Sequence, residues 1–276
     1  MNLAITGATS GIGAETVAAL ASRFHRIFLL VRNIEKGKSL IKNLDTVDKD
    51  EKFAVIYCDL ADLQSVSEAA EAIKSQCESL HVLINNAGGV FPERVLTKAH
   101  HEMTFSTNYL GHFLLTKKLL PLLKKDGNAR VINVSSEAHR AANPDFADLQ
   151  LAKGYQSFTA YANAKLFNIL FTKSLAEKYG RSHIHAYALH PGLVATNIAE
   201  KTTGVFKWIM ALGRPFMISA RKGAKTGVFL ASTPIVPGKN GEYFKKGKVV
   251  TPSKLARSKE MRNTLWNISE DLIKNL

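Results

Sequence analysis

The chain has 276 residues, of which 46% are hydrophobic and 22% are charged, and this composition excludes a disordered or fibrous protein. No apolar stretch reaches the roughly 18 residues of a membrane span, and two cysteines, Cys58 and Cys77, are too few for a disulfide framework or a zinc site. We therefore expect a cytoplasmic protein without a bound metal. The net charge is +14, and residues Lys201 to Leu276 carry most of it, with 15 basic and 4 acidic side chains.

Apolar runs of strand length alternate along the chain with longer segments of helical periodicity, a pattern typical of βαβ units. Strands are predicted at Asn2–Thr6, Arg26–Val31, Phe53–Cys58, His81–Asn85, Arg130–Ser135, His183–His190 and, more weakly, Glu242–Phe244. Helices are predicted at Ile12–Arg23, Glu35–Leu44, Gln64–Cys77, His100–Lys125 in one or two pieces, Ala160–Tyr179, Ala220–Ser232 and Ser258–Leu276. This order predicts one α/β domain over residues 1–276, a Rossmann-type doubly wound parallel sheet of about seven strands with helices on both faces. Its ligand crevice lies at the carboxyl ends of the strands.

A glycine-rich turn follows the first strand. The segment Thr6-Gly7-Ala8-Thr9-Ser10-Gly11-Ile12-Gly13 has the spacing T-G-x-x-x-G-x-G and leads directly into a helix. Backbone N–H groups and the positive end of the helix then surround a point where a pyrophosphate can bind. Taken alone, the motif is also compatible with a tight turn that merely uses glycine.

Four further motifs fall where the same crevice gathers them. Asn85-Asn86-Ala87-Gly88 follows the fourth strand, Val134-Ser135-Ser136 ends the fifth, Tyr161-x-x-x-Lys165 lies in a helix, and Pro191-Gly192-x-Val194-x-Thr196 follows the sixth. With these motifs in this order, the chain resembles the short-chain dehydrogenase/reductase family over essentially its whole length. Ser135-Ser136-Glu137-Ala138-His139-Arg140 and the 24 residues between Ser136 and Tyr161 are similar to its retinol-dehydrogenase-like branch.

The resemblance implies a catalytic set of Asn108, Ser136, Tyr161 and Lys165. It also implies cofactor contacts by Thr6, Gly7, Ser10, Gly11, Ile12, Gly13, Arg32, Asp59, Leu60, Asn86, Ala87, Gly88, Tyr161, Lys165, Pro191, Gly192, Val194 and Thr196. In the family, Tyr161 corresponds to the proton donor, Lys165 holds the nicotinamide ribose, and Asn108 anchors a water that joins Lys165 to solvent. Successive strand residues face opposite ways, so only one of Ser135 and Ser136 can enter the site, and the alignment favours Ser136.

The spacing of Tyr161 and Lys165 supports this chemistry independently, because residues four apart share one helix face. An ammonium about 4 Å from a phenol, at an effective dielectric near 20, is worth roughly 4 kcal/mol, or at most about three pKa units. We therefore expect Lys165 to lower the pKa of Tyr161, which would act as the general acid in carbonyl reduction or the base in alcohol oxidation.

Cofactor choice depends on the end of the second strand, where a carboxylate would accept hydrogen bonds from the ribose of NAD. Val31 occupies that place and Arg32 follows it, and a guanidinium there can pair with a 2′-phosphate, with help from Lys36. NADP(H) is therefore favoured, with NAD(H) as the alternative. Asp59 corresponds to the family residue beside the adenine, although it could instead cap the next helix, a role that Asp62 could also fill.

The segment of about residues 197–220 is rich in large apolar side chains and is expected to cover an apolar ketone, aldehyde or alcohol, although it could equally be a core-facing helix. Phe146, Leu149, Tyr155 and Phe158 could form the facing wall of the substrate site or pack in the core.

The basic region of about residues 245–276 is read as a C-terminal extension. With Lys207, Arg214, Arg221, Lys222 and Lys225, the charge of the final quarter suggests weak contact with anionic surfaces. Solubility is the simpler explanation.

The resulting prediction is an NADP(H)-dependent enzyme that interconverts a carbonyl and an alcohol of apolar character. The alternatives are a reductase of acyl-carrier thioesters and a regulatory protein that binds NADP(H) without turnover. No nucleic-acid module is found, and the question of a homo-oligomer stays open.

Overall fold

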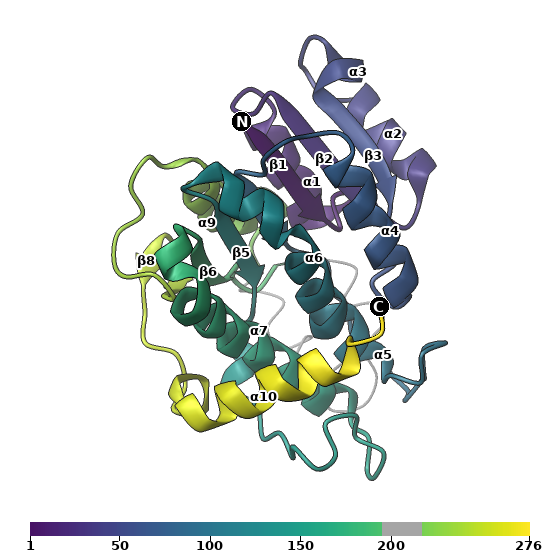
Figure 1. Ribbon diagram of the computed structural model, residues 1–276, viewed down its shortest axis with the longest axis vertical. Coiled ribbons are helices and arrows are strands. Elements are labelled where there is room, and N and C mark those ends of the chain that lie inside the picture. Colours follow the sequence, from purple (N-terminus) through teal and green to yellow (C-terminus); the bar gives the residue numbers. More distant parts are fainter. Residues whose placement is uncertain (195–216) are drawn as a thin grey trace.

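The computed structural model describes residues 1–194 and 217–276, whose strands form one eight-stranded sheet (Figure 1). The strands are β1 (Asn2–Thr6), β2 (Arg26–Val31), β3 (Phe53–Tyr57), β4 (Val82–Asn85), β5 (Arg130–Val134), β6 (His185–His190), β7 (Tyr243–Lys245) and β8 (Lys248–Val249). Their spatial order is β3-β2-β1-β4-β5-β6-β7-β8, and all neighbours pair in parallel except β7 and β8.

The sheet has one strand more than the sequence predicts. The extra strand, β8, pairs antiparallel with β7 through a two-residue turn, Lys246-Gly247, in which both residues have positive φ. Such a turn matches the twist of a hairpin. Two residues are too few to show a periodicity, which is why β8 escaped prediction.

Helices cover both faces of the sheet. They are α1 (Gly11–Leu20), α2 (Ile34–Lys42), α3 (Lys49–Lys52), α4 (Leu63–Lys74), α5 (Met103–Phe105), α6 (Gly111–Asp126), α7 (Ser157–Tyr179), α9 (Ala220–Ser232) and α10 (Lys259–Leu272). Side chains in β1 alternate between two buried clusters: Leu3 and Ile5 pack with α1 and α9, whereas Ala4 packs with α4, α6 and α7. The sheet is thus doubly wound as expected, and the predicted motif turns lie at its carboxyl edge.

The segment predicted as one or two helices from His100 to Lys125 is interrupted near its start. The short helix α5 continues into a π-helical turn, Ser106–Leu110, before α6 begins. A π turn changes the register of backbone hydrogen bonds and often occurs at functional sites. Here it contains Asn108.

The C-terminal helix α10 crosses α7 (Figure 1). Its Trp266 is buried and lies with its ring centroid 5.1 Å from that of Phe113 and 6.2 Å from that of Phe171. Lys117 on α6 donates a 2.7 Å hydrogen bond to Glu270, which fastens the helix further. The end of the chain therefore packs on the same core as α6 and α7. Of the helices in the described ranges, none has the length and apolarity to cross a bilayer.

Candidate active site

The glycine-rich turn between β1 and α1 has the geometry of an anion site. Gly7 and Gly11 adopt positive φ values of 67° and 54°, and a Cβ atom on Gly13 would lie 2.2 Å from the carbonyl oxygen of Gly7. Ser10 precedes α1 in an extended conformation, its side chain makes no capping hydrogen bond, and the first turn of the helix contains no acidic residue. The first backbone N–H groups of α1 have no partner within the helix, so they can donate hydrogen bonds to the pyrophosphate of a dinucleotide.

Thr6 joins this turn to the one that follows β4. Its buried hydroxyl accepts hydrogen bonds of 3.0 Å from the backbone N–H groups of both Asn86 and Ala87. The hydroxyl in turn donates its own hydrogen bond to Nε2 of His112, at 2.9 Å. The Asn86 side chain donates in turn to the carbonyl oxygens of Thr6 and Gly7, at 2.8 and 3.2 Å. The Thr6 side chain therefore links the turn after β1 to the turn after β4.

Asn108 and Lys165 meet beside Gly88. A Cβ atom on Gly88 would lie 3.3 Å from both the Asn108 Oδ1 and the Lys165 Nζ atoms, so glycine leaves the room that these groups need. The Asn108 amide is held in place by the backbone of Gly89, to which it donates at 2.8 Å and from which it accepts at 2.8 Å. Lys165 Nζ donates to the carbonyl oxygen of Val134, at 3.0 Å. Burial lowers the pKa of Lys165 to about 8.

The two serines at the end of β5 have different environments. Ser135 is buried and its hydroxyl donates to the backbone carbonyl oxygen of Lys165 at 2.7 Å. Ser136 is half-buried, accepts a hydrogen bond of 3.2 Å from the N–H of Ala138, and is hydrogen-bonded to the Tyr161 side chain. Of the two hydroxyls, the one at Ser136 lies with Tyr161.

The structure corrects one electrostatic expectation. The Lys165 Nζ atom lies 5.4 Å from the ring centroid of Tyr161 and is hydrogen-bonded to Val134. Burial raises the pKa of Tyr161 above its ordinary value of 10, and the hydrogen bond from Ser136 opposes this only in part. In the protein chain alone, desolvation of the phenolate thus outweighs the attraction of the lysine.

Arg32 and Asp59 stand at the ends of the neighbouring strands β2 and β3. Val31 is buried whereas Arg32 is exposed, and the residue that caps the following helix α2 is Asn33. Asp62 is the N-terminal cap of α4, which leaves the half-buried Asp59 carboxylate to accept a 3.0 Å hydrogen bond from Ala61. Leu60 beside it is buried against Gly111, where a Cβ atom would lie 2.6 Å from the Leu60 carbonyl oxygen.

The turn after β6 closes the crevice on its other side. Pro191 follows β6 directly, and Gly192 has a φ of 100°. Val194 forms a parallel bridge with Ile218, and the N–H of Ile218 donates to the carbonyl oxygen of Leu193 at 2.8 Å. The predicted contact Thr196, the basic residues Lys207 and Arg214, and most of the predicted covering segment lie outside the described residues.

An apolar cluster surrounds the ring of Tyr161. Val90 is buried, and Phe158, Tyr161 and Met217 pack against it. The other predicted wall residues lie elsewhere. Phe146 and Leu149 pack against the main core, and the Tyr155 hydroxyl donates to the carbonyl oxygen of Phe91 at 2.8 Å.

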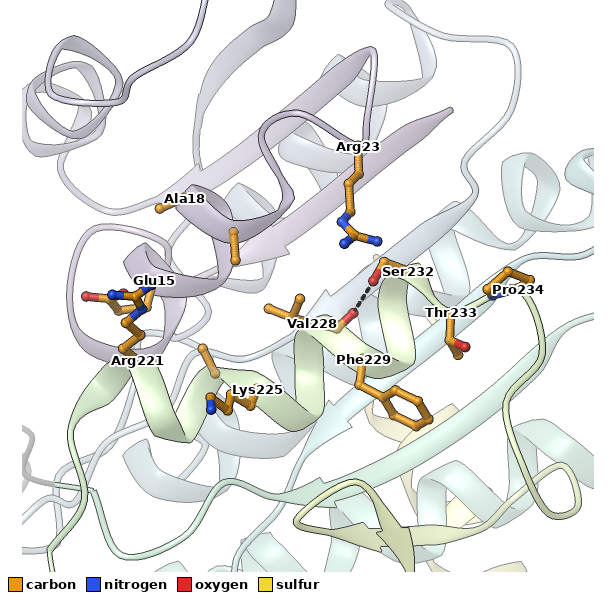
Figure 2. A pocket seen from close by; sticks show the side chains of 12 residues that line it. Glu15, Ala18, Arg23, Arg221, Lys225, Val228, Phe229, Ser232, Thr233 and Pro234 are labelled. Atoms are coloured by element: carbon orange, nitrogen blue, oxygen red, sulfur yellow. Dashed lines mark hydrogen bonds between the residues drawn. The ribbon is translucent and has the colours of Figure 1, made fainter.

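A groove with a volume of about 800 Å³ lies between α1 and α9 (Figure 2). Arg23, Arg221 and Lys225 line it together with Glu15. All three cations are exposed, and none forms an ion pair with a residue in the described ranges. Two of the predicted cations on α9, Arg221 and Lys225, therefore face solvent along one side of this groove.

Two buried histidines near the site were not singled out from the sequence. His112 accepts the Thr6 hydrogen bond, and burial lowers its pKa to about 3, so it is neutral. His139 lies behind Ser136, with Nδ1 2.6 Å from the Ser136 carbonyl oxygen. Each makes contacts across more than one hundred residues of sequence, which no local pattern reveals.

Comparisons with known proteins identify the family of this chain. A family model described as short chain dehydrogenase matches residues 2–204. Retinol dehydrogenase 12 of Mus musculus is 38% identical over 269 residues, which cover 98% of this chain and 85% of that protein. The WW domain-containing oxidoreductase of Homo sapiens is 36% identical over 277 residues, covering 98% of this chain and 67% of its own length.

A solved structure of an uncharacterized protein from Mycobacterium Paratuberculosis superposes with a TM-score of 0.80 at 32% identity, covering 99% of this chain and 93% of that chain. The fold of this family binds NAD(P)(H), and the glycine turns described above fit such a dinucleotide. The chain belongs to the short-chain dehydrogenase/reductase family, in its retinol-dehydrogenase-like branch, and is an oxidoreductase.

Proposed function

We propose that this protein interconverts a carbonyl compound and an alcohol of apolar character, with NADP(H) as the hydride carrier. The observation that carries the proposal is the convergence of Ser136, Tyr161 and Lys165 on one point at the carboxyl edge of the sheet. A regulatory protein without turnover would have no use for this proton-transfer set.

In the proposed mechanism, Ser136, Tyr161 and Lys165 have separate roles. When bound, the nicotinamide dinucleotide supplies or accepts the hydride. In reduction, the Tyr161 hydroxyl donates its proton to the carbonyl oxygen while the Ser136 hydroxyl donates a hydrogen bond to the same oxygen and fixes its direction. Because the pKa of Lys165 is about 8, the ammonium form prevails at neutral pH and favours the developing phenolate. Asn108 Oδ1 and Lys165 Nζ both approach Gly88, so Asn108 is placed to anchor a water through which Lys165 exchanges protons with solvent.

The preference for NADP(H) is supported by the end of β2. Val31 takes the place of a ribose-binding carboxylate, and the exposed Arg32 is free to pair with a 2′-phosphate.

The apolar character of the substrate is supported by Val90, Phe158 and Met217, which pack around the reacting phenol. Relatives named for retinol, an apolar alcohol, agree with it. An acyl group on an acidic carrier would need an additional basic docking surface, for which the exposed cations of α9 are the candidates.

We propose weak contact of these α9 cations with anionic lipid. Arg221, Lys222 and Lys225 are all exposed within the first two turns of α9, and no acidic residue lies in its first turn. Each basic residue near an anionic membrane contributes about 1 kcal/mol at most. The two free thiols, Cys58 and Cys77, support a reducing compartment such as the cytoplasm.

The deciding experiment is a panel of carbonyl compounds of increasing apolar size, followed by the oxidation of NADPH and of NADH. Turnover that rises with apolar size and depends on NADPH supports the proposal. Turnover with acyl-carrier thioesters but not with free apolar carbonyls would instead support the alternative substrate.

A further inference from the structure

His139 makes two hydrogen bonds of opposite sense from a fully buried ring. Its Nδ1 atom lies 2.6 Å from the carbonyl oxygen of Ser136, and its Nε2 atom accepts from the backbone N–H of Ser253 at 3.1 Å. A carbonyl oxygen only accepts and a backbone N–H only donates. The ring is therefore a neutral imidazole with its proton on Nδ1, because any proton on Nε2 would oppose the N–H of Ser253.

The surroundings of the ring favour this neutral form. Burial lowers the pKa of His139, although the Ser136 carbonyl raises it; Arg140 lowers it and Glu137 raises it. The Tyr243 ring packs against the imidazole at a centroid distance of 5.1 Å.

The turn that carries His139 has two further attachments to the C-terminal part of the chain. Glu137 accepts hydrogen bonds from the Tyr243 hydroxyl at 3.0 Å and from Lys245 at 3.2 Å. Arg140 donates to the carbonyl oxygen of Thr251 at 2.9 Å. The turn Glu137–Ala141 is thus fastened to residues 243–253.

The geometry points to a role for this attachment in the orientation of Ser136. We propose that His139 is a positioning residue, which fixes the Ser136 carbonyl relative to Ser253 and so holds the Ser136 hydroxyl toward Tyr161. The inference rests on the proposed function, since it assumes that Ser136 orients the substrate oxygen. The Ser136 hydroxyl itself accepts a 3.2 Å hydrogen bond from the N–H of Ala138, which lies in the same turn as His139, so a shift of this turn moves the hydroxyl. A displacement of about 1 Å in such a group can cost roughly 100-fold in rate.

Two substitutions separate the two hydrogen bonds of the ring. In His139→Asn the side-chain amide can replace Nδ1 as the donor to Ser136, whereas in His139→Gln the longer side chain can replace Nε2 as the acceptor from Ser253. We expect His139→Asn to keep kcat within about threefold of wild type and His139→Gln to lower it about tenfold or more. The KM for NADPH and the affinity measured by fluorescence titration should be unchanged in both. His185 is the first residue of β6, and His185→Asn and His185→Gln control for the loss of a histidine.

A cycle with Ser136→Ala identifies the path of the effect. If His139 acts through Ser136, His139→Gln lowers kcat much less in the Ser136→Ala background than in wild type. Equal losses in both backgrounds, equal losses in the Asn and Gln variants, or no loss in His139→Gln would overturn the inference. Nitrogen NMR of the wild-type imidazoles reports which ring nitrogen of His139 carries the proton and needs neither turnover nor a variant. A proton on Nε2 would also overturn the inference.

The same cycle distinguishes a failure of the proposed role of Ser136 from a failure of the role of His139. Full activity of Ser136→Ala would refute the proposed role of Ser136 itself. Loss of activity in Ser136→Ala together with an active His139→Gln would refute only the role of His139.

Discussion

The hydroxyl of Ser135 donates a 2.7 Å hydrogen bond to the backbone carbonyl oxygen of Lys165. This contact joins the end of β5 to the middle of α7 at the residue whose ammonium group lies over the Tyr161 ring. Ser135 therefore holds α7 in place, while the side chain of its neighbour Ser136 is hydrogen-bonded to that of Tyr161. Of these two adjacent serines, one holds α7 and the other contacts Tyr161.

Tyr161→Phe should reduce turnover at least about 100-fold, because the proton donor is removed while the ring still packs against Val90. NADPH affinity should stay within about twofold. Steady-state NADPH oxidation and a binding titration measure the two effects. Tyr179→Phe at the far end of α7 is the matched control. Near wild-type kcat in Tyr161→Phe would exclude this residue as the acid.

Arg32→Ala should weaken NADPH binding about tenfold or more and leave NADH binding nearly unchanged, since a charge-assisted pair with phosphate is worth about 1.5–3 kcal/mol. Titration calorimetry with both dinucleotides at one ionic strength measures this. Arg23→Ala removes another exposed arginine and serves as the control. Equal affinity of the wild type for the two dinucleotides would contradict the proposed preference.

Phe158→Ser should raise the KM for an apolar carbonyl roughly five- to tenfold, because about 1 kcal/mol of apolar contact is lost beside Tyr161. Phe158→Leu should retain most of the affinity. NADPH affinity should be unchanged in both variants. Kinetics with a long and a short carbonyl compound provide the measurement, and an equal effect on the two would argue against Phe158 as a substrate contact.

Lys165 should make the stability of the protein without dinucleotide depend on alkaline pH. Burial lowers its pKa in the folded state to about 8, below the value of 10.5 in the unfolded chain, so the unfolded state binds more protons between these values. Stability from this group therefore rises with pH across this window. The free energy of unfolding of wild type relative to Lys165→Met should increase by about 2 kcal/mol between about pH 7.5 and 9.5.

Urea unfolding at several pH values measures this difference, with Lys178→Met on the exposed side of α7 as the control. A difference that stays constant over this range would show that Lys165 keeps an ordinary pKa.

Wild-type protein should sediment with anionic vesicles at low salt, remain in solution with neutral vesicles, and detach at physiological salt, where the field extends about 8 Å. Replacement of Arg221, Lys222 and Lys225 by glutamate should abolish sedimentation without loss of NADPH affinity. The same charge change at the exposed residues Lys98, Lys153 and Lys274 is the control. If wild type stays in the supernatant with both kinds of vesicle at low salt, the lipid contact is refuted.

The sequence predicts the strands and helices of this fold closely where burial dictates the pattern. β1, β2 and α9 begin and end at the predicted residues, because apolar runs and a capping serine at position 219 mark them. The π turn around Asn108 was not predicted, since its register depends on tertiary contacts and not on local periodicity.

The site was predictable to the level of motifs but not of individual contacts. The segment Glu137-Ala138-His139-Arg140 was visible as a branch signature, yet its partner Ser253 lies 114 positions further along the chain. The pKa of Tyr161 was expected to fall because only the charge of Lys165 was considered, whereas its direction depends on burial. Such quantities follow from packing, which the spacing of residues does not encode.

The bridge between Val194 and Ile218 has a consequence for the exchange of sequence between relatives. The chain departs from the sheet edge and returns to it at paired positions, so whatever connects them can change in length without moving β6 or α9. A chimera in which the sequence between Val194 and Ile218 comes from a relative should therefore keep β6 and α9 in place, which the urea unfolding of such a chimera measures.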